Sequence, residues 1–196
     1  MPLEMADPPM LAYEAVRSRM TDLAAAAAFG TPALRRAAPD ALALSTPHRV
    51  AVLPFDRIGS AMSLSRCATI KGWRFLVHSG EGVVASADAI AVGAGRYRFG
   101  QINEGPFVAG TEQAIRRAET DARLKKGRYE PVLLMVPALH VVALWLRDAD
   151  DGAADQVIVI APAPGAFRPF EAVSHEDFAV ALAELARGER PEGSRA

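Results

Sequence analysis

The longest apolar run of the chain covers residues 132–146 and is interrupted only by Pro137 and His140. Such a run is typical of central strands that are covered on both faces. Because proline cannot donate a ladder hydrogen bond, the run predicts either two strand segments joined at a kink or one long bent strand. After an acidic turn, residues 156–161 are again apolar. We expect them to pair antiparallel with the first run, as a hairpin at the centre of a sheet.

Alternation of apolar and polar positions predicts further strands in the middle of the chain. Residues 73–78 alternate, a Ser-Gly-Glu-Gly turn follows, and residues 83–92 return the chain, which predicts a hairpin. A Gly-Ala-Gly turn then leads into a third alternating segment at 96–102. These segments are expected to form an antiparallel meander, and residues 49–55 are predicted to form a separate strand.

Helical periodicity appears in three places. Residues 10–29 are rich in alanine and end at Gly30, residues 112–126 follow Thr111 as an N-cap, and a capping box at Ser174 predicts a last helix that runs to about residue 187. Residues 31–47 contain several prolines and alanines, and we expect a loop there with one short helix.

The order of elements is therefore α-β-βββ-α-ββ-α, with strands in neighbouring antiparallel runs. This order predicts an α+β fold, in which helices pack mainly on one face of an antiparallel sheet made of a meander and a hairpin. The expected organisation is an N-terminal helix with an Ala/Pro-rich extension at 1–47, a single α+β core domain at 48–188, and a flexible tail at 189–196.

Composition narrows the classes of protein that fit. The chain has 196 residues, of which 51% are hydrophobic, and this supports a core that needs no disulfide or metal. The net charge of −1 argues against general binding of nucleic acid or of an anionic membrane. The apolar run is shorter than the roughly 20 residues of a membrane span, and the first residues do not resemble a signal peptide. With one cysteine and few lysines, we expect a bacterial, cytoplasmic protein.

Cys67 and His140 are the residues that most resemble catalytic groups. Cys67 is a candidate reactive thiol with His78 or His140 as its base, although a lone cysteine is more typically a small buried hydrophobe. His140 lies inside the apolar run, where it is either a neutral core histidine or a binding residue. The four histidines show no metal-ligand spacing, and the glycines at 93–95 precede a strand pattern rather than a helix. We therefore predict no catalytic residue, no metal and no cofactor.

Two segments are candidate binding surfaces. Arg96 and Arg98 share one face of a predicted strand, where they form either a patch for acidic groups or an ordinary polar outer face. Residues 161–170 are rich in proline and contain Phe167 and Phe170, which either anchor this loop on the core or contact a partner.

These patterns favour a non-catalytic protein-interaction module, such as an adaptor, a chaperone-like factor or an accessory subunit. Its expected partner is another protein or a second copy of the chain. The alternative is a small-molecule-binding protein or an enzyme, with a cavity between a curved sheet and its helices. Trp73 and Trp145 are expected to be buried in one shared sheet core.

Overall fold

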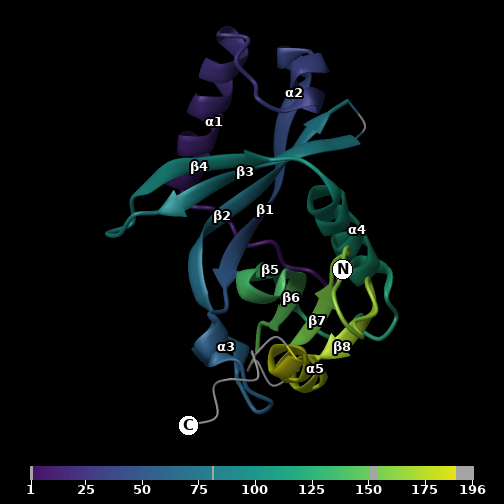
Figure 1. The fold of residues 1–196 in the computed structure, drawn as a ribbon. Coiled ribbons are helices and arrows are strands. Elements are labelled where there is room, and N and C mark those ends of the chain that lie inside the picture. The colour runs from purple at the N-terminus through teal and green to yellow at the C-terminus, as the bar shows by residue number, and fades with distance from the viewer. Residues whose placement is uncertain (1, 81, 151–153, 189–196) are drawn as a thin grey trace.

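The computed structural model describes residues 2–80, 82–150 and 154–188, and its centre is one eight-stranded sheet (Figure 1). The strand order across the sheet is β4-β3-β2-β1-β5-β6-β7-β8. The strands are β1 (Leu42–Val52), β2 (Thr69–Ser79), β3 (Gly82–Ala91), β4 (Tyr97–Asn103), β5 (Tyr129–Val136), β6 (Val141–Asp148), β7 (Gln156–Val159) and β8 (Ala172–Ser174). The helices are α1 (Met10–Ala25), α2 (Pro32–Arg36), α3 (Leu64–Cys67), α4 (Pro106–Thr120) and α5 (His175–Gly188). The α+β class is confirmed, and the expected tail at 189–196 lies outside the described residues.

The sheet is mixed rather than purely antiparallel. Strands β1 to β4 form one antiparallel meander and β5 to β8 form a second, and the two meet where β1 pairs in parallel with β5. The reason is the path of α4, which carries the chain from the outer strand β4 back to the centre of the sheet. A parallel neighbour requires such a crossover, whereas a hairpin turn gives an antiparallel one.

The long apolar run reverses direction instead of bending. Its halves form the antiparallel hairpin β5-β6, and a single 3-10 turn at Pro137–Leu139 joins them. The turn closes at His140, whose backbone is left-handed with φ 53°. Pro137 lies at the start of the turn, where its missing N–H interrupts no ladder. The expected antiparallel pairing with the following apolar segment is confirmed, because β6 pairs with β7.

The predicted meander is confirmed as β2-β3-β4, but the first strand is longer than its pattern indicated. Strand β1 begins at Leu42, inside the segment expected to be a loop, and it runs through the boundary expected at 47/48. Thr46 has φ 48°, and the register with β2 shifts between Ser45 and His48. This bulge, together with the proline that follows Thr46, breaks the alternation and hides the strand from sequence analysis.

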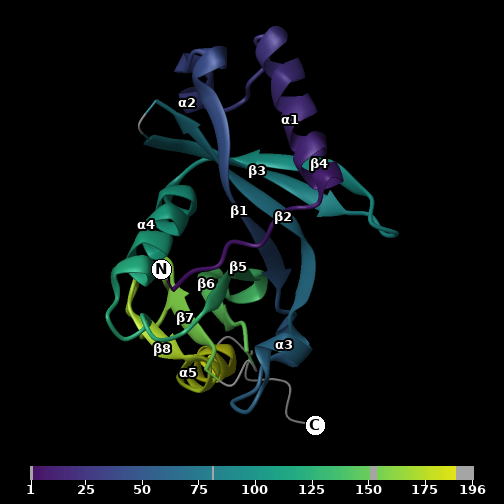
Figure 2. The same ribbon diagram turned by 180° about the vertical axis from the view of Figure 1, so that it is seen from behind.

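Helices lie on both faces of the sheet, with α4 opposite α1 and α5, so the expectation that they pack mainly on one face is not fully confirmed (Figures 1 and 2). Arg49 of β1 lies opposite Trp73 of β2 and Val132 of β5, so these side chains share one face. Trp73 packs in the core cluster under α1, and Val132 packs in the cluster that contains Phe178 of α5. We call this side the α1 face.

The opposite side, which we call the α4 face, buries leucines and isoleucines against Ala114, Ile115 and Ala118 of α4. Helix α4 begins six residues earlier than Glu112, where the sequence predicted its start. Thr111 is therefore inside the helix rather than its cap, and its hydroxyl donates to the carbonyl of Phe107 at 2.7 Å. None of the helices in the described part of the chain has the length and hydropathy needed to cross a membrane.

Both tryptophans are buried, as predicted, but they do not share a core. Trp73 is 5% exposed and packs with α1, whereas Trp145 is 3% exposed and packs in the cluster that contains residues of α5. The indole N–H of Trp145 donates to the carboxylate of Asp155 at 2.7 Å. The sheet is wide enough that strands at its two ends build separate hydrophobic clusters.

Candidate functional site

A groove of about 750 Å³ lies between α1 and the first half of β1. Its helix wall is the part of α1 from Tyr13 to Ala25, and its strand wall is Leu42, Ala43 and Leu44 of β1 with Val77 of β2. Pro39 and Asp40 also line it. Figure 2 shows α1 and the start of β1 at the same end of the molecule. The residues of α1 that line the groove are Tyr13, Arg17, Met20, Thr21, Ala24 and Ala25.

The sequence of α1 explains why this space stays open. The buried residues of the helix are Ala12, Val16 and Met20, which form a single narrow stripe. Helix α1 makes most of its sheet contacts with β3 and β4. At the end of α1, Ala24 and Ala25 carry only methyl side chains, so the gap beside β1 is not filled.

The base of the groove is apolar and its lip is polar. Met20 and Val77 are buried at the base, while Leu42 and Leu44 are half-buried. Arg17, Thr21 and Asp40 are exposed along the lip, and Arg17 forms an ion pair with Glu14 at 3.3 Å. An apolar base with a polar rim is the usual anatomy of a surface that binds another molecule.

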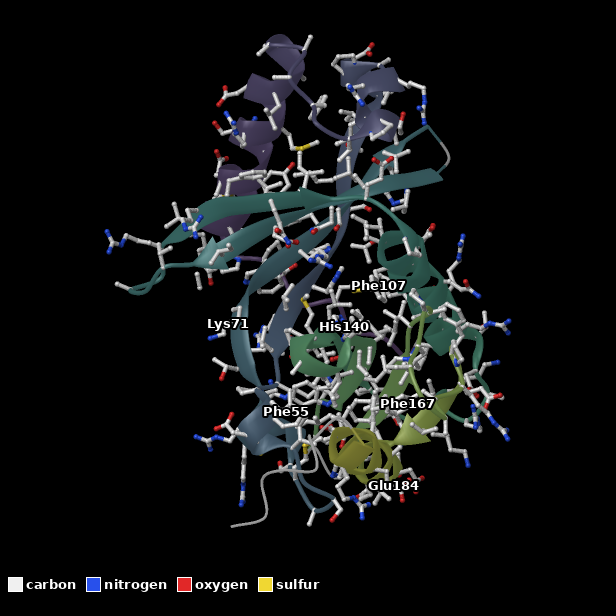
Figure 3. The ribbon with its side chains drawn as sticks, viewed as in Figure 1. Phe55, Lys71, Phe107, His140, Phe167 and Glu184 are labelled. Atoms are coloured by element: carbon white, nitrogen blue, oxygen red, sulfur yellow. The ribbon has the colours of Figure 1, made fainter. Side chains whose placement is uncertain are left out.

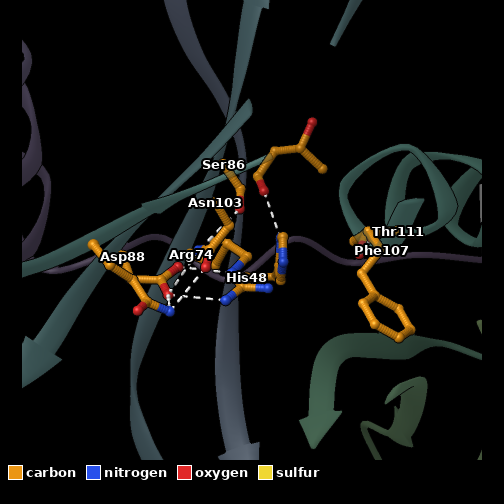
Figure 4. Close-up of polar contacts among 9 residues, drawn as sticks. His48, Arg74, Ser86, Asp88, Asn103, Phe107 and Thr111 are labelled. Atoms are coloured by element: carbon orange, nitrogen blue, oxygen red, sulfur yellow. Dashed lines mark hydrogen bonds and ion pairs between the residues drawn. The ribbon is translucent and has the colours of Figure 1, made fainter. Parts of the chain in front are cut away.

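Apart from the groove, a cluster of polar side chains is buried on the α4 face, and we call it the polar cluster (Figure 4). His48 of β1, Arg74 of β2 and Asp88 of β3 are cross-strand neighbours. Arg74 donates from Nε and Nη2 to the two oxygens of Asp88 at 2.7 and 2.8 Å, in a bidentate pair. The side-chain amides of Asn103 and Gln101 on β4 donate to Asp88 at 3.2 and 3.4 Å. The cluster therefore connects all four strands of the first meander.

His48 is 1% exposed and is neutral in this cluster. Its Nδ1 lies 2.8 Å from the carbonyl oxygen of Thr46, which can only accept, so the proton is on Nδ1. Its Nε2 is buried without a hydrogen-bond partner among the described residues. Burial, with a smaller contribution from the positive charge of Arg74, lowers the pKa of His48 to about 4. Since the charged groups are already paired, the arrangement resembles a structural cross-link more than a reactive centre.

His140 is not a core histidine. It is exposed at the turn between β5 and β6, where the strand direction reverses (Figure 3). Cys67 ends α3 and is half-buried against the cluster that contains residues of α5. The two residues come from different elements.

The remaining candidate binding residues, two arginines and two phenylalanines, lie elsewhere in the fold. Arg96 and Arg98 are exposed at the outer strand β4. Phe167 packs on Phe178 of α5 with ring centroids 5.7 Å apart, whereas Phe170 packs against the cluster on the α4 face. The fold does not bring the candidate residues into one site.

The groove and the polar cluster were both missed by sequence reasoning. Arg74 and Asp88 each interrupt an apolar strand, and this signal could have indicated a buried ion pair. No sequence pattern indicated that His48 is buried, because the bulge before it breaks the alternating pattern of the strand. No sequence signal indicated the groove either, since it forms between α1 and β1, and their relative position depends on how α1 packs.

Within the described residues, no group of three or more histidine, cysteine, aspartate or glutamate side chains is placed to hold a metal ion. Comparison with protein-family models, with curated proteins and with solved structures found no significant match to this chain. Its function is therefore argued from the site itself.

Proposed function

We propose that this protein is a non-catalytic protein-interaction module and that the groove between α1 and β1 is its docking site. The observation that carries the proposal is the groove itself, about 750 Å³ in volume, open, apolar at its base and polar at its lip. It is about twice the size of a charged hollow of about 360 Å³ beside Arg49 and Glu130. An adaptor or chaperone-like role needs such a surface and needs no reactive group.

The polar cluster supports a binding role over a catalytic one. Arg74 and Asp88 already satisfy one another, and they are 5% and 8% exposed. A general base must reach its substrate and titrate near the working pH. His48 is buried and its pKa is lowered to about 4. Its neighbours Arg74 and Asp88 form an ion pair between two strands, so the cluster fits a structural role.

A small apolar ligand is the second candidate occupant. The volume of the groove lies within the range of roughly 300–1,000 Å³ that small-molecule sites span. The groove lies between α1 and β1, so such a ligand would contact both the helix and the sheet. The dye 1-anilinonaphthalene-8-sulfonate, whose aromatic rings fluoresce more strongly in apolar surroundings and whose sulfonate is anionic, tests this alternative. Dye that a groove-binding peptide displaces would show that the groove takes small apolar ligands, whereas dye that stays bound beside the peptide would count against this alternative.

The docking site is tested with a matched pair of variants. Thr21 and Ser18 are both exposed hydroxyl residues on α1, but only Thr21 lines the groove. Peptides of about twelve residues are selected from a displayed random library on the wild-type protein. We expect Thr21→Arg to weaken their binding by about tenfold or more, because it places a charge at the lip, whereas Ser18→Arg leaves it unchanged. Equal binding to both variants, or no selected peptide, would refute the groove as the docking site.

A further inference from the structure

The sheet leaves one apolar strand edge unpaired beside the groove. Strand β1 pairs with β2 along its length, but its pairing with β5 covers only Arg49 to Val52. Residues 42–45 therefore have no strand on their second side in the described part of the chain. In an antiparallel ladder every second residue points its N–H and C=O away from the partner strand. This edge thus offers backbone donors and acceptors to another strand.

The other outer edges of the sheet carry features that block strand addition, whereas residues 42–45, which precede the bulge at Thr46, carry none. The outer strand β4 follows Arg96, contains Arg98 and has a register shift opposite β3, and β8 is only three residues long. Charges, bulges and short length are the devices that protect edge strands from pairing. Residues 42–45 read Leu-Ala-Leu-Ser, without a charge or a proline.

The groove reaches the strand edge itself. Leu42 and Leu44 point to one face of the sheet and Ala43 points to the other, yet all three line the groove. A hollow that lay only over one face would contact alternate residues, because successive side chains point to opposite faces. The hollow therefore extends from the face shared by Leu44 and Val77 to the free edge of β1.

We propose that the occupant of the groove is an extended segment of a partner protein, which adds to the free edge of β1 as a further strand. This inference rests on the proposed function and specifies its partner. Main-chain hydrogen bonds to β1 hold the segment, and the groove selects its side chains. Every second side chain faces Met20, Ala24 and Val77, so these positions are apolar and of moderate size. The intervening side chains point away from α1 and are polar.

The test removes hydrogen bonds from the peptide and leaves its side chains intact. A binder selected on the wild-type protein is resynthesised in two series, with N-methyl groups on the odd or on the even backbone amides. Only one set of amides in an added strand faces β1. We therefore expect one series to lose binding by about tenfold or more and the other to bind as the parent peptide does. Amide exchange of residues 42–45 is expected to slow when the parent peptide binds.

The remaining outcomes refute either the added strand or the docking site. If both series bind like the parent while Thr21→Arg still weakens the parent, the groove is a docking site and the added strand is wrong. If both series lose binding, as a helical peptide would, the added strand is again wrong. If the parent binds Thr21→Arg and Ser18→Arg equally well, the proposed function itself fails, whatever the N-methyl series show.

Discussion

His48 is the residue at which burial and ionisation conflict most directly. Its ring is buried on the α4 face, and burial, the largest influence on it, lowers its pKa to about 4 from the ordinary 6.5. In the unfolded chain the ring titrates near its ordinary value. The two states therefore differ in bound protons between pH 6.5 and 4, and the unfolded state binds more.

This difference predicts that His48 destabilises the fold as the pH falls. Above pH 6.5 the ring is neutral in both states and contributes no pH dependence. Below that value the free energy of unfolding should decrease by up to about 1.4 kcal/mol per pH unit, for a total of about 3 kcal/mol at pH 4. Urea unfolding at pH 7, 5.5 and 4 measures this loss in the wild type.

A comparison with variants separates the contribution of His48 to the pH dependence of stability from that of carboxylates that titrate in the same range. His48→Gln removes the titration, so its stability relative to the wild type should improve by about 3 kcal/mol between pH 7 and pH 4. The control is His140→Gln, because His140 is exposed. A constant difference between His48→Gln and the wild type across this range would show that the ring reaches solvent when protonated.

At the scale of elements, α1 buries the smallest share of its residues among the helices α1 to α5. It has 16 residues and fully buries three of them, two small and one methionine, whereas α5 buries Phe178 and Leu182. Less buried apolar area gives less stabilisation. The chain before α1 is nevertheless anchored, because Tyr129 exchanges backbone hydrogen bonds of 2.8 Å with Pro2 and Glu4.

Amide hydrogen exchange should therefore show α1 opening locally before the central strands. We expect amides of α1 to exchange through a low-energy opening, while those of β5 exchange only with global unfolding. Helix α5 serves as the internal reference, since it buries a larger apolar face. If α1 proved as protected as β5, another chain would have to cover it. Dilution of the protein would then remove the protection.

At the scale of the whole molecule, the two meanders are joined by one shared strand. Strand β1 belongs to the first meander, yet its Ala51 packs in the cluster that contains residues of α5, and its Val50 packs in the cluster under α4. Leu53, directly after the strand, also packs in the first of these clusters. The two clusters beside β5 therefore cannot form without β1 in place. This sharing favours unfolding as a single cooperative unit.

The two tryptophans provide one probe for each meander. Trp145→Phe leaves Trp73 to report on the cluster under α1, and Trp73→Phe leaves Trp145 to report on the cluster that contains residues of α5. In each variant we expect fluorescence and far-ultraviolet circular dichroism to follow the same urea transition. If the Trp73 signal changed at lower urea than the circular dichroism, the first meander would unfold independently and the shared strand would not couple the halves.

Local pattern and turn chemistry were enough to predict many of the elements. The Gly-rich turns predicted β2-β3-β4, and the acidic turn predicted the pairing of β6 with β7. The capping box at Ser174 is present, with the amide of Asp177 donating to the serine oxygen at 3.1 Å. Each of these features depends on residues within a few positions of one another, so the sequence alone determines them.

Only the tertiary structure decided which buried surfaces meet. An apolar strand or stripe shows that a residue is buried, but it does not show which distant element covers it. The parallel pairing of β1 with β5, the helices on both faces, the burial of His48 and the groove beside Leu42 all depend on contacts between remote segments. The free energy of such contacts depends on how well remote segments fit together and on how much apolar surface they bury against each other. The spacing of residues within one segment does not predict either quantity.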